Sequence, residues 1–352
     1  MNLDDLAYFQ SIDRAGMLAH IEGFPGQLQA AWALGQSLPL PDLAGVTQVV
    51  LAGVGGSVTG GALLAALTAQ ECRIPFTLCR DYDLPGWAAG PQTLVIGASH
   101  TGRHEEALSA FRGAASRGAR LLALTTGGPL AGLAREAGGA IWEYAYAGPP
   151  RAALGYTFAL PLALFCRAGW IPDKTAELTG ALAALREQQK SLRAESPVTR
   201  NPAKRMAGQF MDRYVLLFGS GFMGAVARRW KTQVNENAKA WAQSEELPEM
   251  DYDSVVGVTH PEALVTKYMA LFLESDYAGP RNQLRSRFTR ELFMTSGFNT
   301  DVVRGVGPTP LAQLLTGLHY GDYVSYYLAM AYGVDPTPVE PIEAIRERMA
   351  GM

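Results

Sequence analysis

The stretch that decides the fold is Val49-Val50-Leu51-Ala52-Gly53-Val54-Gly55-Gly56-Ser57-Val58-Thr59-Gly60-Gly61. Its first four residues are apolar and predict a buried strand, and the glycines that follow predict a turn that opens a helix. In such a turn the backbone N–H groups of Gly55, Gly56 and Ser57 can approach an anion at the helix N-terminus, where the helix dipole favours negative charge. We therefore predict a phosphate-binding turn.

A dinucleotide-binding turn is the main alternative for the same stretch. Its fingerprint requires a glycine three residues after Gly55, where this chain has Val58, and no GxxxxGK[ST] string occurs. Both nucleotide-binding interpretations are therefore disfavoured, and we predict no cofactor. Glycines that serve only the sterics of a turn remain the structural alternative.

The chain around this stretch alternates short apolar runs with helical periodicity, after a first helical segment that ends near Gln36. This pattern is typical of a parallel sheet with helical crossovers. The predicted strands are Val46–Ala52, Phe76–Arg80, Thr93–Gly97, Arg120–Thr125 and Ala140–Tyr144. The predicted helices lie near Gly60–Gln70, Glu105–Arg117, Leu130–Ala137, Thr157–Gly169 and Lys174–Arg193.

The polar segment Ser196–Pro202 contains two prolines, as linkers do. We therefore predict an N-terminal domain at residues 1–195 and a C-terminal domain at residues 196–352. The second half resembles the first in outline, because Leu217–Phe222 repeats the strand and Gly/Ser turn of Leu51–Ser57. Its predicted strands are Tyr214–Gly219, Ser254–Val258, Met269–Glu274 and Val302–Val306. The predicted fold class is α/β, with two domains that each hold a mostly parallel five-stranded sheet flanked by helices on both faces.

A second candidate loop follows the third predicted strand. Ser99 and Thr101 place two hydroxyls ahead of a helix that begins near His104, so hydroxyls and free N–H groups can converge on one phosphate. Helix capping alone is the structural alternative. In an open parallel sheet, ligands bind beyond the carboxyl ends of the strands, where this loop and the Gly53–Ser57 turn both lie.

Glu236 is a candidate base in the second half. It lies on a predicted helix between two amides, Asn235 and Asn237. A carboxylate suits proton transfer between adjacent carbons of a sugar. A solvated helix face is the structural alternative.

Composition narrows the choice of partner and compartment. The net charge is −3 without a run of like charges, which disfavours nucleic acid and anionic membranes as partners and favours a small molecule. Three cysteines without CxxC spacing argue against a disulfide framework or a zinc site. His100 and His104 have helical spacing but no third ligand in register, so we predict no metal. Without a signal peptide or an apolar run of about 20 residues, we expect a cytoplasmic protein with no membrane span.

Together these strings resemble the bifunctional phosphoglucose/phosphomannose isomerase family, which is built from two sugar-isomerase (SIS) domains. The resemblance covers nearly the whole chain. The strings that carry it are Gly53-Val54-Gly55-Gly56-Ser57, Ser99-His100-Thr101-Gly102, Pro150-Arg151-Ala152-Ala153-Leu154-Gly155, Asn235-Glu236-Asn237-Ala238-Lys239, Leu247-Pro248-Glu249, and Gly321–Ala329 running into Val334–Val339.

The resemblance implies aldose–ketose isomerisation of hexose 6-phosphates through an enediolate, without metal or nucleotide, by a homodimer. It implies that Arg151 supports the enediolate and that Glu236 moves the proton between C1 and C2. The residues implied to hold the substrate phosphate are Ser57, Ser99 and Thr101, with His104 where the family has a threonine.

Two departures from the family concern ring opening. Tyr252 stands where the family has a histidine that assists ring opening across the dimer, and Arg346 stands where it has a lysine. Tyrosine and arginine exchange protons poorly near neutral pH. A second hypothesis is therefore a sugar-phosphate-binding regulatory protein with lost or altered turnover. A nucleotide-dependent enzyme of the same fold class is the third.

Overall fold

The structure is a computed structural model that describes residues 2–351. Within them the chain forms two compact units. The first unit is Gly23–Leu182, and the second joins the N-terminal segment up to Glu22 to the chain from Ala183 onward. This division falls within helix α8 (Thr175–Leu192). The domain boundary predicted between residues 195 and 196 lies further along the chain and stays a prediction.

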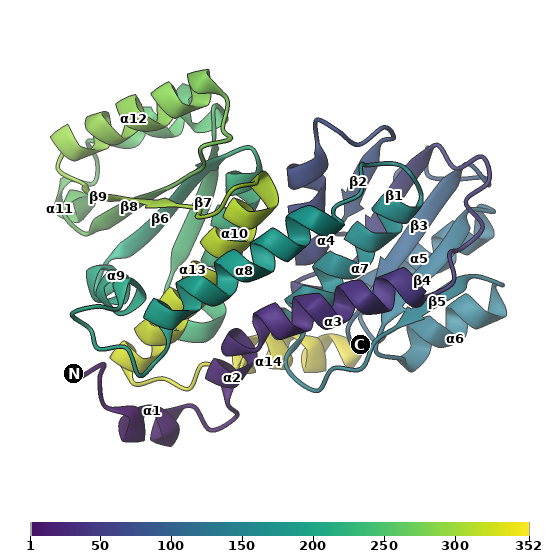
Figure 1. Cartoon of the computed structure of the whole chain (residues 1–352), viewed down its shortest axis with the longest axis horizontal. Helices are drawn as coiled ribbons and strands as arrows, with labels where there is room; N and C mark the ends of the chain where they lie inside the picture. Colours follow the sequence, from purple (N-terminus) through teal and green to yellow (C-terminus); the bar gives the residue numbers. More distant parts are fainter. Residues whose placement is uncertain (1, 352) are drawn as a thin grey trace. The chain divides into compact units, whose positions relative to one another are not determined.

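The first unit contains a five-stranded parallel sheet with the strand order β2-β1-β3-β4-β5 (Figure 1). Its strands are β1 (Gln48–Ala52), β2 (Phe76–Cys79), β3 (Thr93–Ala98), β4 (Arg120–Thr125) and β5 (Ala140–Glu143). All five predicted strands are confirmed to within two residues at each end. The strands are easy to predict because they are apolar and buried; every residue of β3 is buried.

Helices cover the first sheet on both faces. They are α3 (Phe24–Ser37), α4 (Gly56–Thr68), α5 (Glu105–Ser116), α6 (Gly128–Glu136) and α7 (Leu154–Arg167), with the 3₁₀ turn η1 (Pro150–Ala152) before α7. Val50 and Val95 pack in a cluster with Phe111 of α5 and Leu130 of α6. The next residue, Leu51, contacts α4 at Gly61. Successive residues of β1 therefore face opposite layers, as strand geometry requires.

The second unit contains a parallel sheet of four strands, where five were predicted, with the order β7-β6-β8-β9. Its strands are β6 (Tyr214–Ser220), β7 (Ala242–Leu247), β8 (Tyr268–Glu274) and β9 (Asn299–Arg304). In both units the first strand in sequence lies second in the sheet. The predicted resemblance between the two halves is therefore present in their topology.

Two strand assignments in the second unit require correction. The predicted strand Ser254–Val258 is instead a 3₁₀ helix, η3 (Ser254–Gly257), in which Val256 is 77% exposed. β7 was not predicted, because only its two end residues, Ala242 and Leu247, are buried and the residues between them are polar. β7 is an edge strand, and an edge strand needs no continuous apolar run.

The second unit contains further helices in addition to part of α8. They are α1 (Leu6–Ile12), α2 (Met17–Glu22), α9 (Pro202–Phe210), α10 (Phe222–Ala238), α11 (Glu262–Val265), α12 (Pro280–Thr295), α13 (Pro310–Tyr332) and α14 (Glu340–Ala350), with the 3₁₀ turn η2 (Glu249–Tyr252). Helix α12 covers one face of this sheet, and α10 with the buried α13 covers the other (Figure 1). A buried ion pair joins α10 to α13, with Arg229 Nη2 3.0 Å from Asp322 Oδ2.

Within residues 2–351, no helix combines the length and the apolar character that a bilayer span requires.

Candidate functional site

The predicted glycine turn has a specific backbone conformation that occurs twice. Gly55 caps α4 with φ 57° and ψ −135°, and Gly221 caps α10 with φ 55° and ψ −131°. This left-handed conformation favours glycine, because a Cβ would clash there. The correspondence between Leu51–Ser57 and Leu217–Phe222 is therefore present in the backbone as well as in the sequence.

A hydrogen bond connects the loop after β1, which contains Ser57, to the loop after β3, which contains Ser99 and His100. The side chain of Ser57 is 1% exposed, and its Oγ accepts a hydrogen bond from the His100 N–H at 3.0 Å. Ser99 Oγ accepts one from the His104 N–H at 3.3 Å. A hydroxyl that accepts a hydrogen bond can still donate its own hydrogen. Both hydroxyls are therefore fixed in place and able to donate to a ligand oxygen.

Thr101 and His104 complete the β3 loop. Thr101 is exposed, and its carbonyl lies so close to Gly128 that a Cβ on Gly128 would come within 2.3 Å of the Thr101 oxygen. His104 occupies the N-cap position of α5 without a capping bond from its side chain. The predicted helix start near His104 is confirmed, and the loop packs tightly against the loop after β4.

Arg151 lies beside the glycine turn, although the two are far apart in sequence. Arg151 is 4% exposed and lies in η1. A Cβ on Gly56 would lie 2.8 Å from both Cα and N of Arg151, so only glycine permits this approach. The structure thus brings Gly56, Ser57, Ser99 and Arg151 together at one edge of the first sheet. This edge lies where β1 has β2 on one side and β3 on the other, the usual position of ligand sites in such folds.

His100 has a role that the sequence did not reveal. Its Nδ1 lies 3.2 Å from the Tyr144 hydroxyl, and the Tyr144 ring stacks on Tyr156 with centroids 4.8 Å apart. Burial lowers the pKa of His100, an effect partly opposed by a backbone hydrogen bond with Gly148, so the imidazole is neutral near pH 7. The contact between His100 and Tyr144 connects the loop after β3 to the residue that directly follows β5. The only signal in the sequence was its position between Ser99 and Thr101.

Glu236 belongs to the second unit, near the C-terminal end of α10. Its two neighbouring amides are structural: Asn235 Oδ1 accepts the Ala242 N–H at 2.8 Å, and Asn237 Nδ2 donates to Ser325 Oγ at 3.0 Å. Lys239, in the left-handed conformation, ends the helix and donates from Nζ to the Glu236 carbonyl at 2.5 Å. These contacts fix the backbone that carries the half-buried Glu236 carboxylate.

The two altered family positions also belong to the second unit. Tyr252 is 73% exposed, and its hydroxyl accepts a hydrogen bond from Arg285 Nη2 at 3.2 Å. The same guanidinium binds Asp251 Oδ2 at 2.9 Å, so it holds Tyr252 beside an ion pair. Arg346 lies on α14 and is exposed. The predicted phosphate-binding residues and Arg151 lie in the first unit, whereas Glu236, Tyr252 and Arg346 lie in the second.

In the described part of the chain, no group of three His, Cys, Asp or Glu side chains could hold a metal ion. Cys72, Cys79 and Cys166 are free thiols.

Comparisons with known proteins match the C-terminal part of the chain to a family model and nearly the whole chain to a curated relative. A family model described as "Bacterial phospho-glucose isomerase C-terminal SIS domain" matches residues 199–349. A bifunctional phosphoglucose/phosphomannose isomerase from Caldicellulosiruptor bescii is 34% identical over 341 residues, which cover 95% of this chain and 99% of that protein.

Two solved structures share the fold. One is a glucose-6-phosphate isomerase like protein from Thermus thermophilus, with a TM-score of 0.63, 19% identity, and coverage of 96% of this chain and 98% of that one. The other is the C-terminal domain of glucosamine-fructose-6-phosphate aminotransferase from Francisella tularensis, with a TM-score of 0.71, 12% identity, and coverage of 92% and 98%. At these identities the two structures bear on the fold alone, and they confirm the predicted fold class.

Proposed function

This chain belongs to the bifunctional phosphoglucose/phosphomannose isomerase family, and we propose that it interconverts glucose 6-phosphate and mannose 6-phosphate with fructose 6-phosphate. The observation that carries the proposal is the pair of buried hydroxyls, Ser57 and Ser99, hydrogen-bonded into adjacent loops at the carboxyl edge of the first sheet. Such an edge is where α/β proteins bind small ligands.

In the proposed binding step, the sugar phosphate lies on this edge. The hydroxyls of Ser57, Ser99 and Thr101 donate to phosphate oxygens, and the N–H groups of Gly55 and Gly56 add the positive end of the α4 dipole. The phosphate fixes the substrate, so the reacting carbons are held in place without a strong bond to the sugar itself.

In the proposed chemical step, the open-chain aldose loses its C2 proton to the Glu236 carboxylate. The electron pair of the C–H bond moves to form the C1–C2 double bond of an enediolate, and the carbonyl oxygen takes the negative charge. The guanidinium of Arg151 stabilises that charge. The hydroxyl proton on O2 then passes to O1, the C2–O2 carbonyl forms as the C1–C2 double bond gives its electron pair to C1, and Glu236 returns its proton to C1 to give the ketose. A positioned base of this kind contributes about 10²- to 10⁴-fold to the rate.

A regulatory sugar-phosphate-binding protein is the second candidate. The observation that favours it is Tyr252, whose hydroxyl is bound by Arg285 at the place where the family has a histidine. If neither Tyr252 nor Arg346 moves a proton to the ring oxygen, the cyclic sugar would bind without reacting.

Hydrogen exchange in deuterated water separates the two candidates. We would incubate the protein with glucose 6-phosphate, mannose 6-phosphate and fructose 6-phosphate separately, and follow the C1 and C2 hydrogens by NMR. We expect deuterium incorporation and interconversion with the wild type and neither with Glu236→Gln. The matched control is Glu187→Gln, on an exposed face of α8 where the carboxylate binds Lys190.

Each result has a defined meaning. Exchange that survives in Glu236→Gln would refute the assigned base. Phosphate-dependent binding without exchange in the wild type would establish the regulatory candidate. Exchange with fructose 6-phosphate alone would locate a defect in ring opening. We further propose a homodimer in the cytoplasm, and light scattering of the purified protein would test the dimer.

A further inference from the structure

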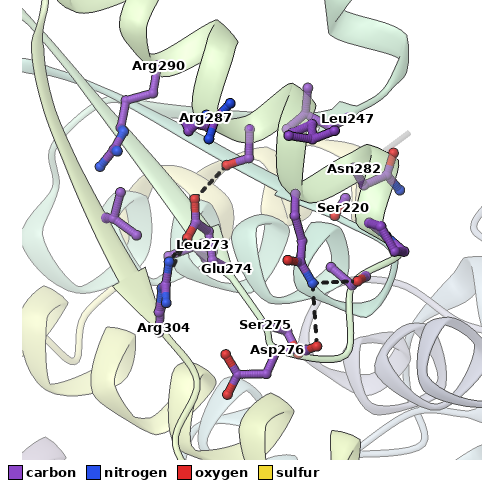
Figure 2. A pocket seen from close by; sticks show the side chains of 16 residues that line it. Ser220, Leu247, Leu273, Glu274, Ser275, Asp276, Asn282, Arg287, Arg290 and Arg304 are labelled. Atoms are coloured by element: carbon purple, nitrogen blue, oxygen red, sulfur yellow. Dashed lines mark hydrogen bonds and ion pairs between the residues drawn. The ribbon is translucent and has the colours of Figure 1, made fainter.

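The second unit contains a pocket at the carboxyl edge of its own sheet. Its volume is about 840 Å³, within the range of about 300–1,000 Å³ that is typical of small-molecule sites. Its floor is formed by the ends of four strands, including Ser220 of β6 and Glu274 of β8, and its roof by α12 from Pro280 to Arg290 (Figure 2). β6 lies between β7 and β8, so the pocket lies at the edge where such folds bind ligands.

Three guanidinium groups line this pocket: Arg287 and Arg290 of α12, and Arg304 at the end of β9. Arg304 is neutralised, because its Nε and Nη2 both lie 3.1 Å from Glu274 Oε2. The other oxygen of Glu274 accepts a hydrogen bond from Ser286 Oγ at 2.8 Å. The single negative charge of Glu274 is therefore already balanced by Arg304.

The two α12 arginines lack a comparable partner. Arg287 lies 3.9 Å from Glu291 Oε1, with both side chains 53% exposed, which makes a weak ion pair. Arg290 is half-buried, and its guanidinium forms no ion pair or hydrogen bond with any residue from 2 to 351. Residues three apart on a helix lie on the same face, and both side chains line the pocket (Figure 2). The roof therefore presents two positive charges to the pocket.

The floor offers hydrogen-bonding groups of the kind that sugars use. Asp276 lines it with a carboxylate of which one oxygen, Oδ2, accepts a bond from Gln313 Nε2 at 2.9 Å. Ser220 adds a hydroxyl in the floor, and Asn282 of α12 adds an amide from the roof (Figure 2). A carboxylate floor repels a bare anion but accepts hydrogen bonds from hydroxyls.

We propose that this pocket binds a second phosphorylated sugar, with the phosphate on Arg287 and Arg290 and the sugar hydroxyls on Asp276 and Asn282. Two adjacent guanidinium groups suit a phosphate, since each can bind two of its oxygens. Every residue that lines the pocket belongs to the second unit, whereas Ser57 and Ser99 belong to the first. The inference does not depend on isomerase activity.

The test measures binding of fructose 6-phosphate by isothermal titration calorimetry to a chain whose first edge is disabled by Ser57→Ala and Ser99→Ala. We expect about one fructose 6-phosphate to remain bound per chain. Adding Arg287→Gln or Arg290→Gln should weaken this binding about tenfold or more each. The matched control is Arg281→Gln, on the same helix but outside the pocket lining. Fructose without phosphate, and inorganic phosphate alone, should both bind more weakly than fructose 6-phosphate.

The outcomes keep this inference apart from the proposed function. No binding to the folded Ser57→Ala/Ser99→Ala chain, or binding that Arg287→Gln, Arg290→Gln and Arg281→Gln leave equally unchanged, would overturn it. Inorganic phosphate as tight as fructose 6-phosphate would overturn the sugar part. In the otherwise wild-type chain, Arg287→Gln with Arg290→Gln should leave isomerisation intact. If the wild type shows arginine-dependent binding but no hydrogen exchange, the proposed function fails and this inference stands.

Discussion

Adding a single methyl group at Gly56 tests whether the Arg151 segment must lie against the phosphate-binding turn. Gly56 is the first residue of α4, and its φ is not in the left-handed region. Alanine is therefore compatible with its backbone conformation, and any penalty comes from the neighbouring atoms. This makes Gly56→Ala a cleaner test than a change at Gly55, where the backbone itself would be strained.

The size of the penalty follows from the distances. The new Cβ would lie 2.8 Å from the Cα and N of Arg151 and 2.9 Å from the carbonyl carbon of Pro150, whereas ordinary contact begins at 3.4 Å. The Arg151 backbone would therefore have to move by about 0.6 Å. Overpacking of this kind costs about 1–3 kcal/mol, partly offset by the roughly 0.4–1 kcal/mol that alanine gains by restricting the unfolded chain. We expect a net loss of about 1–2 kcal/mol in the free energy of unfolding.

The effect on catalysis should exceed the effect on stability. A misplacement of about 1 Å can cost about 10²-fold in rate, so we expect kcat/KM for glucose 6-phosphate to fall by about 10- to 100-fold. Gly113→Ala in α5 is the matched control, because no atom lies within 4 Å of its Cβ position. That change should stabilise the protein by about 0.5–1 kcal/mol and leave kcat/KM unchanged. Urea unfolding and steady-state kinetics measure both quantities. If Gly56→Ala behaves like Gly113→Ala, close packing of Arg151 against the turn does not matter for function.

Three further predictions address the site and the pH dependence of stability. Ser99→Ala should raise KM for each sugar phosphate by about tenfold through loss of a charge-assisted hydrogen bond, with kcat nearly unchanged in steady-state kinetics; an unchanged KM would remove Ser99 from the phosphate site. Tyr252→His should raise kcat with the cyclic aldoses and introduce a pH dependence centred near 6.5; equal rates for both proteins at pH 6 to 8 would refute a role in ring opening. Burial lowers the pKa of His319, whose Nε2 lies 2.8 Å from the Ile21 carbonyl. Below a pH of about 6.5 the unfolded chain therefore binds a proton that the folded chain does not. The free energy of unfolding then falls by up to about 1.4 kcal/mol per pH unit. Urea unfolding at pH 5 and pH 7 should show a smaller difference for His319→Gln than for the wild type, and an equal difference would count against His319 as the source.

The elements that the sequence predicts well are those whose burial is uniform. β4 was predicted with its observed bounds, Arg120–Thr125, because five of its six residues are buried between two layers of helices. The edge strand β7 and the 3₁₀ helix η3 were mispredicted for the opposite reason. In β7, a polar segment pairs with a single neighbouring strand, β6, and in η3 a valine-rich segment finds no strand to pair with. Local composition carries no information about either circumstance.

The candidate site divides in the same way. Ser57, Ser99 and Thr101 could be predicted because their chemistry is concentrated in short strings directly after strands. The position of Arg151 against Gly56 could not, since their backbones meet only when α4 and η1 pack together. The arginine-lined pocket of the second unit left no signal at all. Its charged residues come from β8 and the loop after it, from β9 and from α12, and no local motif joins these elements.

The two sheets show why the fold alone does not determine where phosphate binds. In each unit the strand before the glycine turn lies between the next two strands of the sequence: β1 between β2 and β3, and β6 between β7 and β8. Gly55 and Gly221 also have nearly the same dihedral angles. Two residues beyond these glycines the first unit has Ser57 and the second has Met223. Met223 is 2% exposed, and its Cε lies 3.6 Å from the Cβ position of Gly317, so its side chain fills the packing between α10 and α13. A helix N-terminus without such a hydroxyl keeps the dipole but loses the directed donor. The anion site proposed for the second unit therefore uses Arg287 and Arg290 of α12, which covers the face of the sheet opposite α10.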